Sequence, residues 1–459
     1  DKLRNDFMSI LKNNSQVIRG DIVFSISPSE VKCVENGFLV VVDGICQGVY
    51  YNIPEEYEYL DLVDYSGKII MPGMSDIHVH ASQYGFRGLG MNLELLDWLN
   101  TYTFKEEAKF SDREYAHKAY SIFVEDLLSS MTTRACIFGT IHTEGTLELM
   151  DILEKSGLKT MVGKVNMDRE CPNYLCEESV KRSVSDTERY IVNSLKDFEN
   201  TEPIITPRFV PTCSDELMKE LSKLRNKYKL NVQSHLSENR SEIELVSELN
   251  KESKFYGDAY DMFGLFGGDY SAVMAHCVYS SEEEIELMRK NNVFVAHCPA
   301  SNMNLASGIA PIRKLMDANV NIGLGTDIGA GHSISMFRCV TDAVQVSKLY
   351  WRLVDESYKP LDINEAFYLA TVGGGKLFGK VGSFNKGYEA DIVVYDDSDL
   401  KTLYKMSLQE RFERLLYLGS TNNVILKYVS GEKIYDRKTK LVDNKILVKE
   451  GLYWEHKLC

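Results

Sequence analysis

The sequence lacks the features of membrane, secreted and nucleic-acid-binding proteins. No apolar run approaches the roughly 20 residues that a membrane-spanning helix needs, and residues 1–14 contain no apolar core like that of a signal peptide. Basic residues never cluster, and 52 Lys and Arg against 67 Asp and Glu leave a net charge of −15, which disfavours a phosphate-backbone partner. We therefore expect a cytoplasmic protein that binds neither membranes nor nucleic-acid polymers, although the sequence begins without Met.

Cysteine and glycine motifs are missing as well. The 10 cysteines are scattered along the chain without a C-x-x-C pair, so we expect all of them to be reduced thiols. Four residues separate Cys171 from Cys176, which excludes the cysteine pair of a cytidine-deaminase zinc site. Gly373-Gly374-Gly375-Lys376 lacks the earlier glycine and the following Ser or Thr of a phosphate-binding loop. Neither a disulfide scaffold nor a nucleotide-phosphate loop is indicated.

The composition is that of a folded globular protein. Hydrophobic residues make up 44% of the chain and charged residues 26%, both near the average for soluble domains. A length of 459 residues leaves room for a barrel of about 250 residues or more and an accessory domain. The sequence has no internal repeat and no low-complexity segment, so the architecture has to be predicted from periodicity alone.

Eight strand-like apolar runs alternate with longer helical stretches in the middle of the chain. They cover residues 75–80, 132–138, 160–165, 203–209, 230–235, 272–276, 293–297 and 320–326. This alternation is typical of repeated β/α units with a parallel sheet. We therefore predict an α/β protein whose residues 69–378 form a (β/α)8, TIM-like barrel.

Short strand patterns with turn signals flank this region on both sides. They cover residues 21–26, 37–42 and 45–50 before it, and 390–395 and 423–428 after it. We expect the two ends, residues 1–68 and 379–459, to pack together as one smaller β-sandwich domain beside the barrel.

Five residues that could act as metal ligands stand at or just after the ends of the predicted strands. They are His78, His80, His235, His276 and Asp327. A single histidine at a strand end is more often a hydrogen-bonded or exposed imidazole than a ligand. The carboxyl ends of barrel strands converge on one face, however, and His78 and His80 share one side of their strand because side chains alternate. Imidazole and carboxylate ligands suit zinc or iron, so the pattern predicts a catalytic metal site.

Two carboxylates near these ligands are candidates for proton transfer. Glu238 follows His235 by three residues, where a turning chain can bring it back over the metal as a proton shuttle. Asp327 follows a run of small residues and serves as a ligand or as the base that accepts a proton from the reacting water. A solvated loop acid is the alternative for Glu238, and a helix N-cap is the alternative for Asp327. The other histidines, including His297, are not expected to be ligands.

Several sequence motifs of the chain resemble those of a known family. Met71-Pro72-Gly73-Met74-Ser75-Asp76-Ile77-His78-Val79-His80 resembles the P-G-x-x-D-x-H-x-H strand that opens the barrel of the amidohydrolase superfamily. Further stretches are similar to the guanine deaminases of that superfamily, in the same order and with similar spacing. They cover residues 81–84, 95–99, 102–104, 206–209, 233–239, 274–276 and 323–327.

This resemblance implies an activity and a set of roles. The activity is the hydrolytic deamination of guanine to xanthine and ammonia, with Glu238 as the proton shuttle and His276 beside the reacting water. The implied metal ligands are His78, His80, His235 and Asp327. The implied substrate contacts are Gln83, Arg208 and Phe209, together with Ala81 and Ser82. The fourth strand ends in Arg208-Phe209 without a lysine that could bridge two metals, so one Zn²⁺ per chain is expected, with Fe²⁺ as the alternative. A homodimer is also expected.

Two other functions stay open at this point. The first is a deaminase or chlorohydrolase of the same superfamily that acts on cytosine, an adenosine-type compound or a triazine. The second is a non-catalytic homologue that serves as a scaffold, since a fold alone does not fix a function. Arg208 could also be a structural ion-pair residue and Phe209 an ordinary core residue. Gln83, Arg208 and Phe209 together favour guanine among these alternatives.

Overall fold

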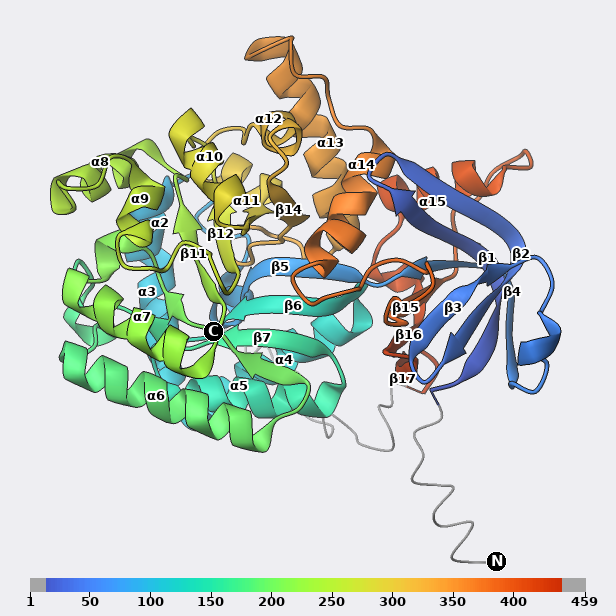
Figure 1. Cartoon of the computed structure of the whole chain (residues 1–459), viewed down its shortest axis with the longest axis horizontal. Coiled ribbons are helices and arrows are strands. Elements are labelled where there is room, and N and C mark those ends of the chain that lie inside the picture. The colour runs from blue at the N-terminus through green and yellow to red at the C-terminus, as the bar shows by residue number, and fades with distance from the viewer. Residues whose placement is uncertain (1–13, 440–459) are drawn as a thin grey trace, which may run out of the picture.

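Strands from both ends of the chain form one seven-stranded sheet, with the order β17-β16-β15-β4-β1-β2-β3. The structure, a computed structural model, describes residues 14–439. The strands are β1 (Gln16–Ser27), β2 (Glu30–Val42), β3 (Ile45–Tyr50), β4 (Leu62–Pro72), β15 (Ile392–Tyr395), β16 (Val424–Val429) and β17 (Glu432–Asp436). β4 connects the strands from the two ends of the chain, because it pairs parallel with β1 and antiparallel with β15 (Figure 1).

The strands of the middle region pair in parallel. They form two four-stranded sheets, β5-β6-β7-β9 and β11-β12-β13-β14, and the short pair β10-β8. Their bounds are β5 (Met74–His80), β6 (Thr132–Phe138), β7 (Lys159–Gly163), β8 (Val165–Asn166), β9 (Thr201–Pro203), β10 (Thr206–Pro207), β11 (Val232–Leu236), β12 (Ala272–His276), β13 (Val293–His297) and β14 (Asn321–Leu324). The predicted α/β class is confirmed, and it combines parallel sheets with one mixed sheet.

Backbone contacts connect the edges of the two parallel sheets. On one side Ile205 bridges Val232 of β11. On the other side the His80 N–H donates to the carbonyl oxygen of Ile328 over 2.7 Å, and the Asp327 N–H donates to that of His78 over 2.9 Å. The carboxyl end of β5 therefore lies beside the segment that follows β14, which brings the two groups of predicted ligands together.

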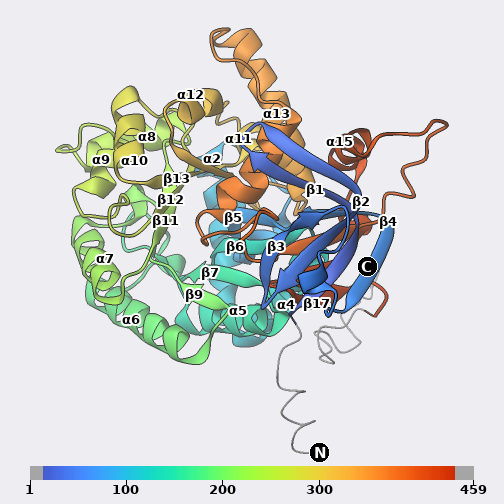
Figure 2. The same cartoon turned by 45° about the vertical axis from the view of Figure 1, so that its right-hand side comes forward.

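Helices cover the outside of the parallel strands (Figure 2). The helices are α2 (Leu95–Trp98), α3 (Phe104–Ala108), α4 (Arg113–Ser129), α5 (Thr143–Ser156), α6 (Val180–Asp197), α7 (Asp215–Tyr228), α8 (Arg240–Leu249), α9 (Tyr256–Asp261), α10 (Glu282–Lys290), α11 (Pro299–Asn304), α12 (Ile312–Asp317), α13 (Met336–Leu353), α14 (Ile363–Tyr368) and α15 (Leu408–Leu418). Serine caps begin several of them, as where Ser214 accepts from the Leu217 N–H of α7. Within residues 14–439 no helix is both long and apolar enough to cross a membrane.

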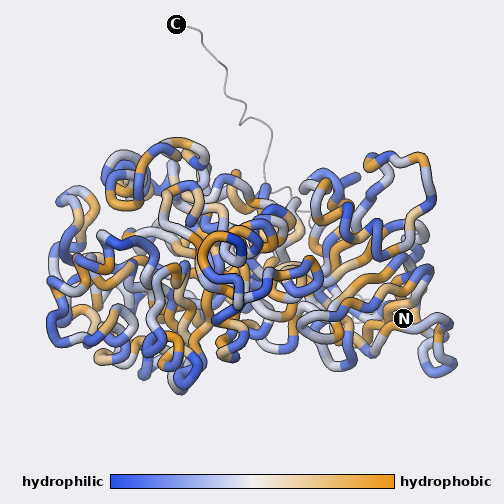
Figure 3. Tube along the Cα trace, turned by 90° about the horizontal axis from the view of Figure 1, so that it is seen from above, coloured by the Kyte–Doolittle hydropathy of each residue, from blue (hydrophilic) through white to orange (hydrophobic). Residues whose placement is uncertain are grey.

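Hydrophobic segments concentrate in the interior of both parts of the molecule. In the view from above, long hydrophobic stretches run through its middle, while hydrophilic residues prevail along the left-hand rim (Figure 3). β12 and β13 are buried at every position, as expected for parallel strands covered by helices. The buried strands thus provide a rigid base for the side chains at their carboxyl ends.

A buried ion-pair network connects the parallel strands to the seven-stranded sheet. Arg134 of β6 donates from Nε to Asp391 Oδ2 over 2.7 Å and from an NH2 group to Asp391 Oδ1 over 3.0 Å. The same guanidinium contacts Glu389 at 2.8 Å. Close by, Nζ of the buried Lys427 donates to the carbonyl oxygens of Leu127 and Thr132. Charged groups that are satisfied in this way fix the position of one sheet against the other.

One prediction about the cysteines is wrong. Cys171 and Cys176 form a disulfide in the loop that follows β8, where a short 3-10 turn brings their Cα atoms to 5.6 Å. Spacing alone did not indicate this pair, because the turn between the two residues creates their proximity. The other seven cysteines within residues 14–439 are free thiols, as expected, and Cys459 lies outside the described residues.

Candidate metal centre and substrate pocket

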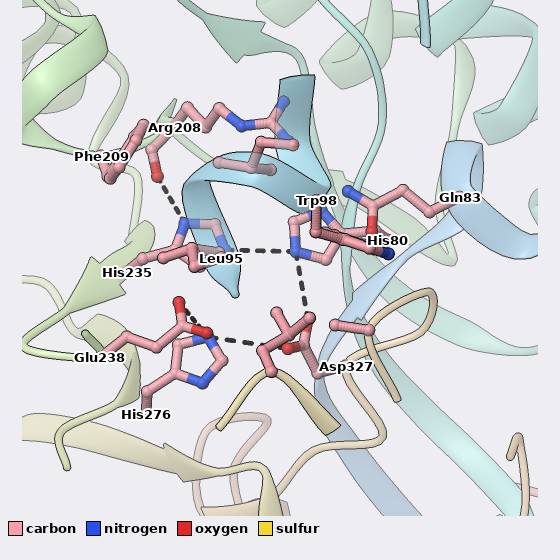
Figure 4. A pocket seen from close by; sticks show the side chains of 13 residues that line it. His80, Gln83, Leu95, Trp98, Arg208, Phe209, His235, Glu238, His276 and Asp327 are labelled. Carbon is pink, nitrogen blue, oxygen red and sulfur yellow. Dashed lines mark hydrogen bonds and ion pairs between the residues drawn. The ribbon is translucent and has the colours of Figure 1, made fainter. Parts of the chain in front are cut away.

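Four side chains that the sequence proposed as metal ligands meet at the carboxyl ends of β5, β11 and β14. Nε2 of His80 lies 3.2 Å from Nε2 of His78 and 3.2 Å from Nε2 of His235. Asp327 Oδ1 lies 3.1 Å from His78 Nε2 and 3.4 Å from His80 Nε2. Residues nearly 250 positions apart in the sequence therefore converge on one point (Figure 4).

His276 and Glu238 stand on the neighbouring side of this cluster. Nε2 of His276 is 3.3 Å from Glu238 Oε2 and 3.7 Å from Asp327 Oδ2. Both side chains are buried. The structure thus brings all the predicted catalytic and metal-binding residues into one site.

Hydrogen bonds hold two of the imidazoles with Nε2 facing the centre. Nδ1 of His235 donates to the carbonyl oxygen of Arg208 over 2.6 Å, and Nδ1 of His276 donates to Oδ1 of Asn302 over 2.9 Å. An acceptor on one ring nitrogen fixes the proton there and leaves the lone pair on the other. Among the described residues, His78 Nδ1 has no such partner.

The backbone around Asp327 is held in an unusual conformation. Asp327 has φ of 46° and His276 has φ of 78°, both in the left-handed region that residues with a Cβ seldom adopt. Asp76 stabilises this turn, because its carboxylate accepts from the Thr326 N–H over 3.0 Å and from the Thr326 hydroxyl. Such strain is tolerated where a site requires a particular side-chain direction.

Burial and nearby charges set the protonation states. Burial lowers the pKa of His80 to about 4, and burial together with the adjacent imidazoles lowers the pKa of His235 well below its usual value. Burial acts to raise the pKa of Asp327, but His78 and the other histidines outweigh it and hold that pKa far below the usual range. His80 and His235 are therefore neutral imidazoles and Asp327 is a carboxylate, which are the forms that bind metal ions.

Glu238 has the opposite tendency. Burial, followed by the charge of Asp327, raises the pKa of the Glu238 carboxyl well above its ordinary value. The carboxyl therefore keeps its proton at pH values where an exposed glutamate has lost it. A buried carboxylic acid that retains a proton beside a pocket is suited to general acid catalysis.

The donor set fits a metal ion. His78, His80 and Asp327 offer ligand atoms within 4.8 Å of one another, and so do His78, His235 and His276. Nitrogen and oxygen donors of this kind in a pocket are typical of catalytic zinc or iron sites. Cys298 also lies within this distance of His276 and Asp327. Burial raises the pKa of its thiol well above the usual range, which disfavours the thiolate that binds metals.

A cavity opens beside these ligands and has both polar and apolar walls. Its lining residues are His80, Gln83, Leu95, Trp98, Leu99, Arg208, Phe209, His235, Glu238, His276, Leu305, Asp327 and Ala330. Gln83 and Arg208 point into it from the side opposite Glu238 and His276 (Figure 4). The cavity therefore separates a polar end formed by Gln83 and Arg208, here called the recognition end, from the predicted catalytic side chains.

The predicted substrate contacts divide into two groups. Gln83, Arg208 and Phe209 line the cavity. Ala81 and Ser82 are buried in the turn that follows β5 and do not line it, and the Ser82 hydroxyl donates to the carbonyl oxygen of Gly139. These two residues belong to the segment that carries Gln83.

Several residues of the site were missed in the sequence. Trp98, Leu95, Leu99, Leu305 and Ala330 supply most of the apolar lining. The first three lie in a stretch that carried the family resemblance, but nothing in their spacing marked them as pocket residues. Glu107 of α3 was missed as well, although it is buried against Gln83 and Arg208.

Among the described residues, the remaining histidines do not belong to the groups of possible metal ligands. His297 is buried at the end of β13, where burial lowers its pKa to about 3, and neither ring nitrogen has a partner among the described residues. His117 bonds to Glu148 on α5, and His332 bonds to Asn304. His142 precedes α5, and His456 lies outside residues 14–439.

Comparison with known proteins shows the family of the chain. The pattern of the amidohydrolase family matches residues 69–434. The chain belongs to the amidohydrolase family.

Within this family, the chain is similar to guanine deaminases. The chain is 34% identical to guanine deaminase of Dictyostelium discoideum over 445 residues, which cover 91% of this chain and 98% of that protein. It is 34% identical to the Escherichia coli enzyme of the same name, over 89% of this chain and 93% of that one. The crystal structure of guanine deaminase from C. acetobutylicum with bound guanine matches with a TM-score of 0.89 and 46% identity, and the match covers 92% of this chain and 100% of that one.

Proposed function

We propose that this chain deaminates guanine hydrolytically to xanthine and ammonia. The observation that carries the proposal is a single cavity that joins three kinds of group. These are a cluster of imidazole and carboxylate donors, a carboxyl that keeps its proton, and the donor groups of Gln83 and Arg208. The guanine deaminases to which the chain is similar, one of them solved with bound guanine, support the same substrate.

The proposal includes one zinc ion, held by His78, His80, His235 and Asp327, with ferrous iron as the alternative. When bound, such an ion lowers the pKa of a coordinated water to about 7. Chelation is expected to abolish turnover, and readdition of either zinc or iron identifies the ion that restores it. The melting temperature offers a second readout, because a ligand at about 100 times its Kd stabilises the native state by about 2.7 kcal/mol.

The recognition end of the cavity suits a purine with a carbonyl oxygen. Arg208 and the amide of Gln83 can donate to this oxygen, because both side chains carry N–H groups that face the cavity. Phe209 can cover one face of the ring. Ala81 and Ser82 take part by anchoring the turn that carries Gln83.

The catalytic side chains move protons in a defined order. Asp327 accepts one proton of the reacting water through Oδ2, and Nε2 of His276 assists by orienting that water. As water adds to C2 of guanine, Glu238 gives its proton to N3. The Glu238 carboxylate then takes the proton of the new hydroxyl group at C2 and passes it to the amino group, so that the C2–N bond breaks, ammonia leaves and the carbonyl of xanthine forms. The proton taken from the water then returns to Glu238 and restores the starting state.

Substitution of Glu238 tests this order. Glu238→Gln removes the proton that the carboxyl donates, and we expect kcat to fall about 10²- to 10⁴-fold while metal content stays unchanged. Glu365→Gln is the matched control, since Glu365 is a buried glutamate on α14 whose partner is Arg313, away from the cavity. Near-normal turnover of Glu238→Gln with intact metal would show that another group transfers the proton.

The alternative functions predict other outcomes of one assay. Ammonia release and the ultraviolet change are measured with guanine, adenine, cytosine and a triazine on protein of known metal content. Turnover of another ring in place of guanine would keep the metal site and overturn the pocket assignment. Metal-loaded protein that turns over none of the four compounds would favour a scaffold role.

The architecture, location and assembly complete the proposal. We propose that the two parallel sheets close into one (β/α)8 barrel of residues 69–378, supported by the backbone contacts at both of their edges. Residues 1–68 and 379–459 are proposed as the second domain, with the β-sandwich form expected from the sequence, and residues 1–13 and 440–459 of this range lie outside the described residues. A homodimer is proposed from the family resemblance, and light scattering measures its mass. A cytoplasmic location is proposed from the sequence features given above.

A further inference from the structure

Glu107 lies between the two polar residues at the recognition end of the cavity. Its Oε2 accepts from NH1 of Arg208 over 2.6 Å, and its Oε1 accepts from NH2 of Arg208 over 3.1 Å and from Nε2 of Gln83 over 3.0 Å. The carboxylate therefore accepts three hydrogen bonds, and both of its oxygens bond to the guanidinium. A bidentate pair of this kind restricts direction as well as distance.

The same contact fixes which way the Gln83 amide points. Its nitrogen donates to Glu107, while its oxygen accepts from the Gly329 N–H over 3.0 Å. Because both ends of the amide are engaged, a flip would place donor against donor at Gly329 and acceptor against acceptor at Glu107. The second N–H of the amide is the group that stays available to a ligand.

Charge gives Glu107 a second role. The exposed fractions of Glu107, Gln83 and Arg208 are 1%, 2% and 3%, so the guanidinium is almost fully removed from water. A buried cation needs a partner, and Glu107 is the carboxylate in direct contact with this one. The phenyl ring of Phe104, 5.1 Å from the Arg208 guanidinium, packs against the same pair. The result is a recognition end that is neutral overall but offers only N–H donors.

We infer that Glu107 is a positioning residue that determines specificity, because it commits Arg208 and Gln83 to the recognition of a ring carbonyl. This inference rests on the proposed function and names its substrate class: purines with a carbonyl group at the end of the ring that meets Arg208. A purine with an amino group at that place sets donor against donor and leaves buried N–H groups unpaired. Unpaired buried donors are the strongest basis for rejecting a close analogue.

Binding of two purines tests the inference independently of turnover. Hypoxanthine carries the carbonyl and adenine carries the amino group, and neither has the 2-amino group of guanine. Calorimetry is expected to show that the wild-type protein prefers hypoxanthine. Glu107→Gln is expected to weaken hypoxanthine binding by up to about 100-fold and to reduce the preference, since both donors lose their fixed direction. KM for guanine is expected to change more than kcat.

A double-mutant cycle separates positioning from general destabilisation. If Glu107 acts through Arg208, Glu107→Gln has little further effect on hypoxanthine binding in an Arg208→Met background. Glu365→Gln breaks another buried Arg–Glu pair and is expected to leave the ratio of the two dissociation constants unchanged. Glu107→Asp keeps the charge with a shorter reach, provides a second variant if Glu107→Gln does not fold, and is expected to give an intermediate ratio.

The outcomes distinguish this inference from the proposed function. A Glu107→Gln protein that keeps the wild-type ratio, or that loses as much binding without Arg208, overturns the role of Glu107. A wild type that binds the two purines equally also overturns it. A wild type that prefers hypoxanthine but does not turn over guanine overturns the proposed function alone, and the ratio in Glu107→Gln then decides the inference.

Discussion

Nδ1 of His235 donates to the carbonyl oxygen of Arg208 over 2.6 Å. A proposed metal ligand is therefore oriented by the backbone of the residue whose guanidinium lines the recognition end of the cavity. Because the acceptor belongs to the main chain, substitution of the Arg208 side chain can leave the imidazole in place. The metal site and the recognition end can thus be altered separately, although a single hydrogen bond connects them.

Loss of the His235 imidazole should separate metal binding from folding. We expect His235→Ala to lower metal affinity at least about 100-fold, because loss of a partner that only orients a ligand already costs about 10- to 100-fold. Turnover should fall with metal content, which elemental analysis measures beside the activity assay. His117→Ala is the control, since His117 is an exposed histidine on α4 whose ring bonds to Glu148. Full metal content in His235→Ala would exclude this residue from the ligand set.

Asn302 is expected to matter for catalysis although it does not line the cavity. Its Oδ1 accepts from Nδ1 of His276 and so keeps Nε2 directed at Glu238 and Asp327. Asn302→Ala should lower kcat by about 10- to 100-fold, the effect of losing a partner that orients a functional histidine. Metal content and the KM for guanine should change little. Asn321→Ala, which removes a side chain that bonds only to Asn292 among the described residues, is the control.

The ion pair between Arg134 and Glu389, which connects the parallel strands to the seven-stranded sheet, should weaken at acidic pH. Burial acts to raise the pKa of Glu389, but the Arg134 guanidinium and the hydrogen bonds from Arg134, Ser430 and Lys159 lower it to about 2. A pKa below the unfolded value of about 4.3 means that the stabilisation is complete above that pH. It is lost progressively as the pH falls from about 4.3 towards 2.

Urea unfolding of Glu389→Gln measures this effect. At pH 7 the variant should have a free energy of unfolding lower by about 1.5–3 kcal/mol, the range for hydrogen bonds to charged groups. The difference between the two proteins should shrink as the pH is lowered from 5 to 3. A difference that stays constant over this range would contradict the assignment of the ion pair as its source.

The disulfide between Cys171 and Cys176 can be checked by alkylation. Without reductant these two cysteines should resist labelling, and reduction should make both reactive in unfolded protein. Because the bond closes a short loop, its loss should lower the free energy of unfolding by only about 2 kcal/mol. The measurement also bears on the proposed location, since cytosolic proteins rarely keep disulfides. A label on both cysteines in protein isolated under alkylating conditions would show that the thiols are free in the cell.

Buried parallel strands were the most predictable part of the fold. The predicted runs at 132–138, 272–276 and 293–297 coincide with β6, β12 and β13. β12 and β13 each consist of four apolar residues followed by a histidine, which is a clear strand pattern. The run at 203–209 divides into β9 and β10 instead. Pro203 and Pro207 supply no N–H to the ladder, which a count of apolar residues does not register. The β-sandwich expected from the two chain ends stays a prediction.

The site was predictable where its chemistry has few alternatives. Histidines at the ends of several parallel strands indicated a metal site, and the structure brings them within ligand distance of one another. Glu107 shows the limit of this reasoning. Its neighbour Glu106 bonds to Lys109 and Tyr115 on the surface side, whereas Glu107 is buried against Arg208. Two adjacent glutamates look alike in a sequence, and only the packing of α3 distinguishes them.

The seven-stranded sheet also governs when this protein can finish folding. β1, β2, β3 and β4 find their first partners within the early part of the chain. The other edge of β4 has to wait for β15, since Pro72 pairs with Ile392. During synthesis that edge presents unpaired N–H and C=O groups, which invite pairing with other chains. The nascent chain therefore carries an open sheet edge on the ribosome until Ile392–Tyr395 of β15 have been translated.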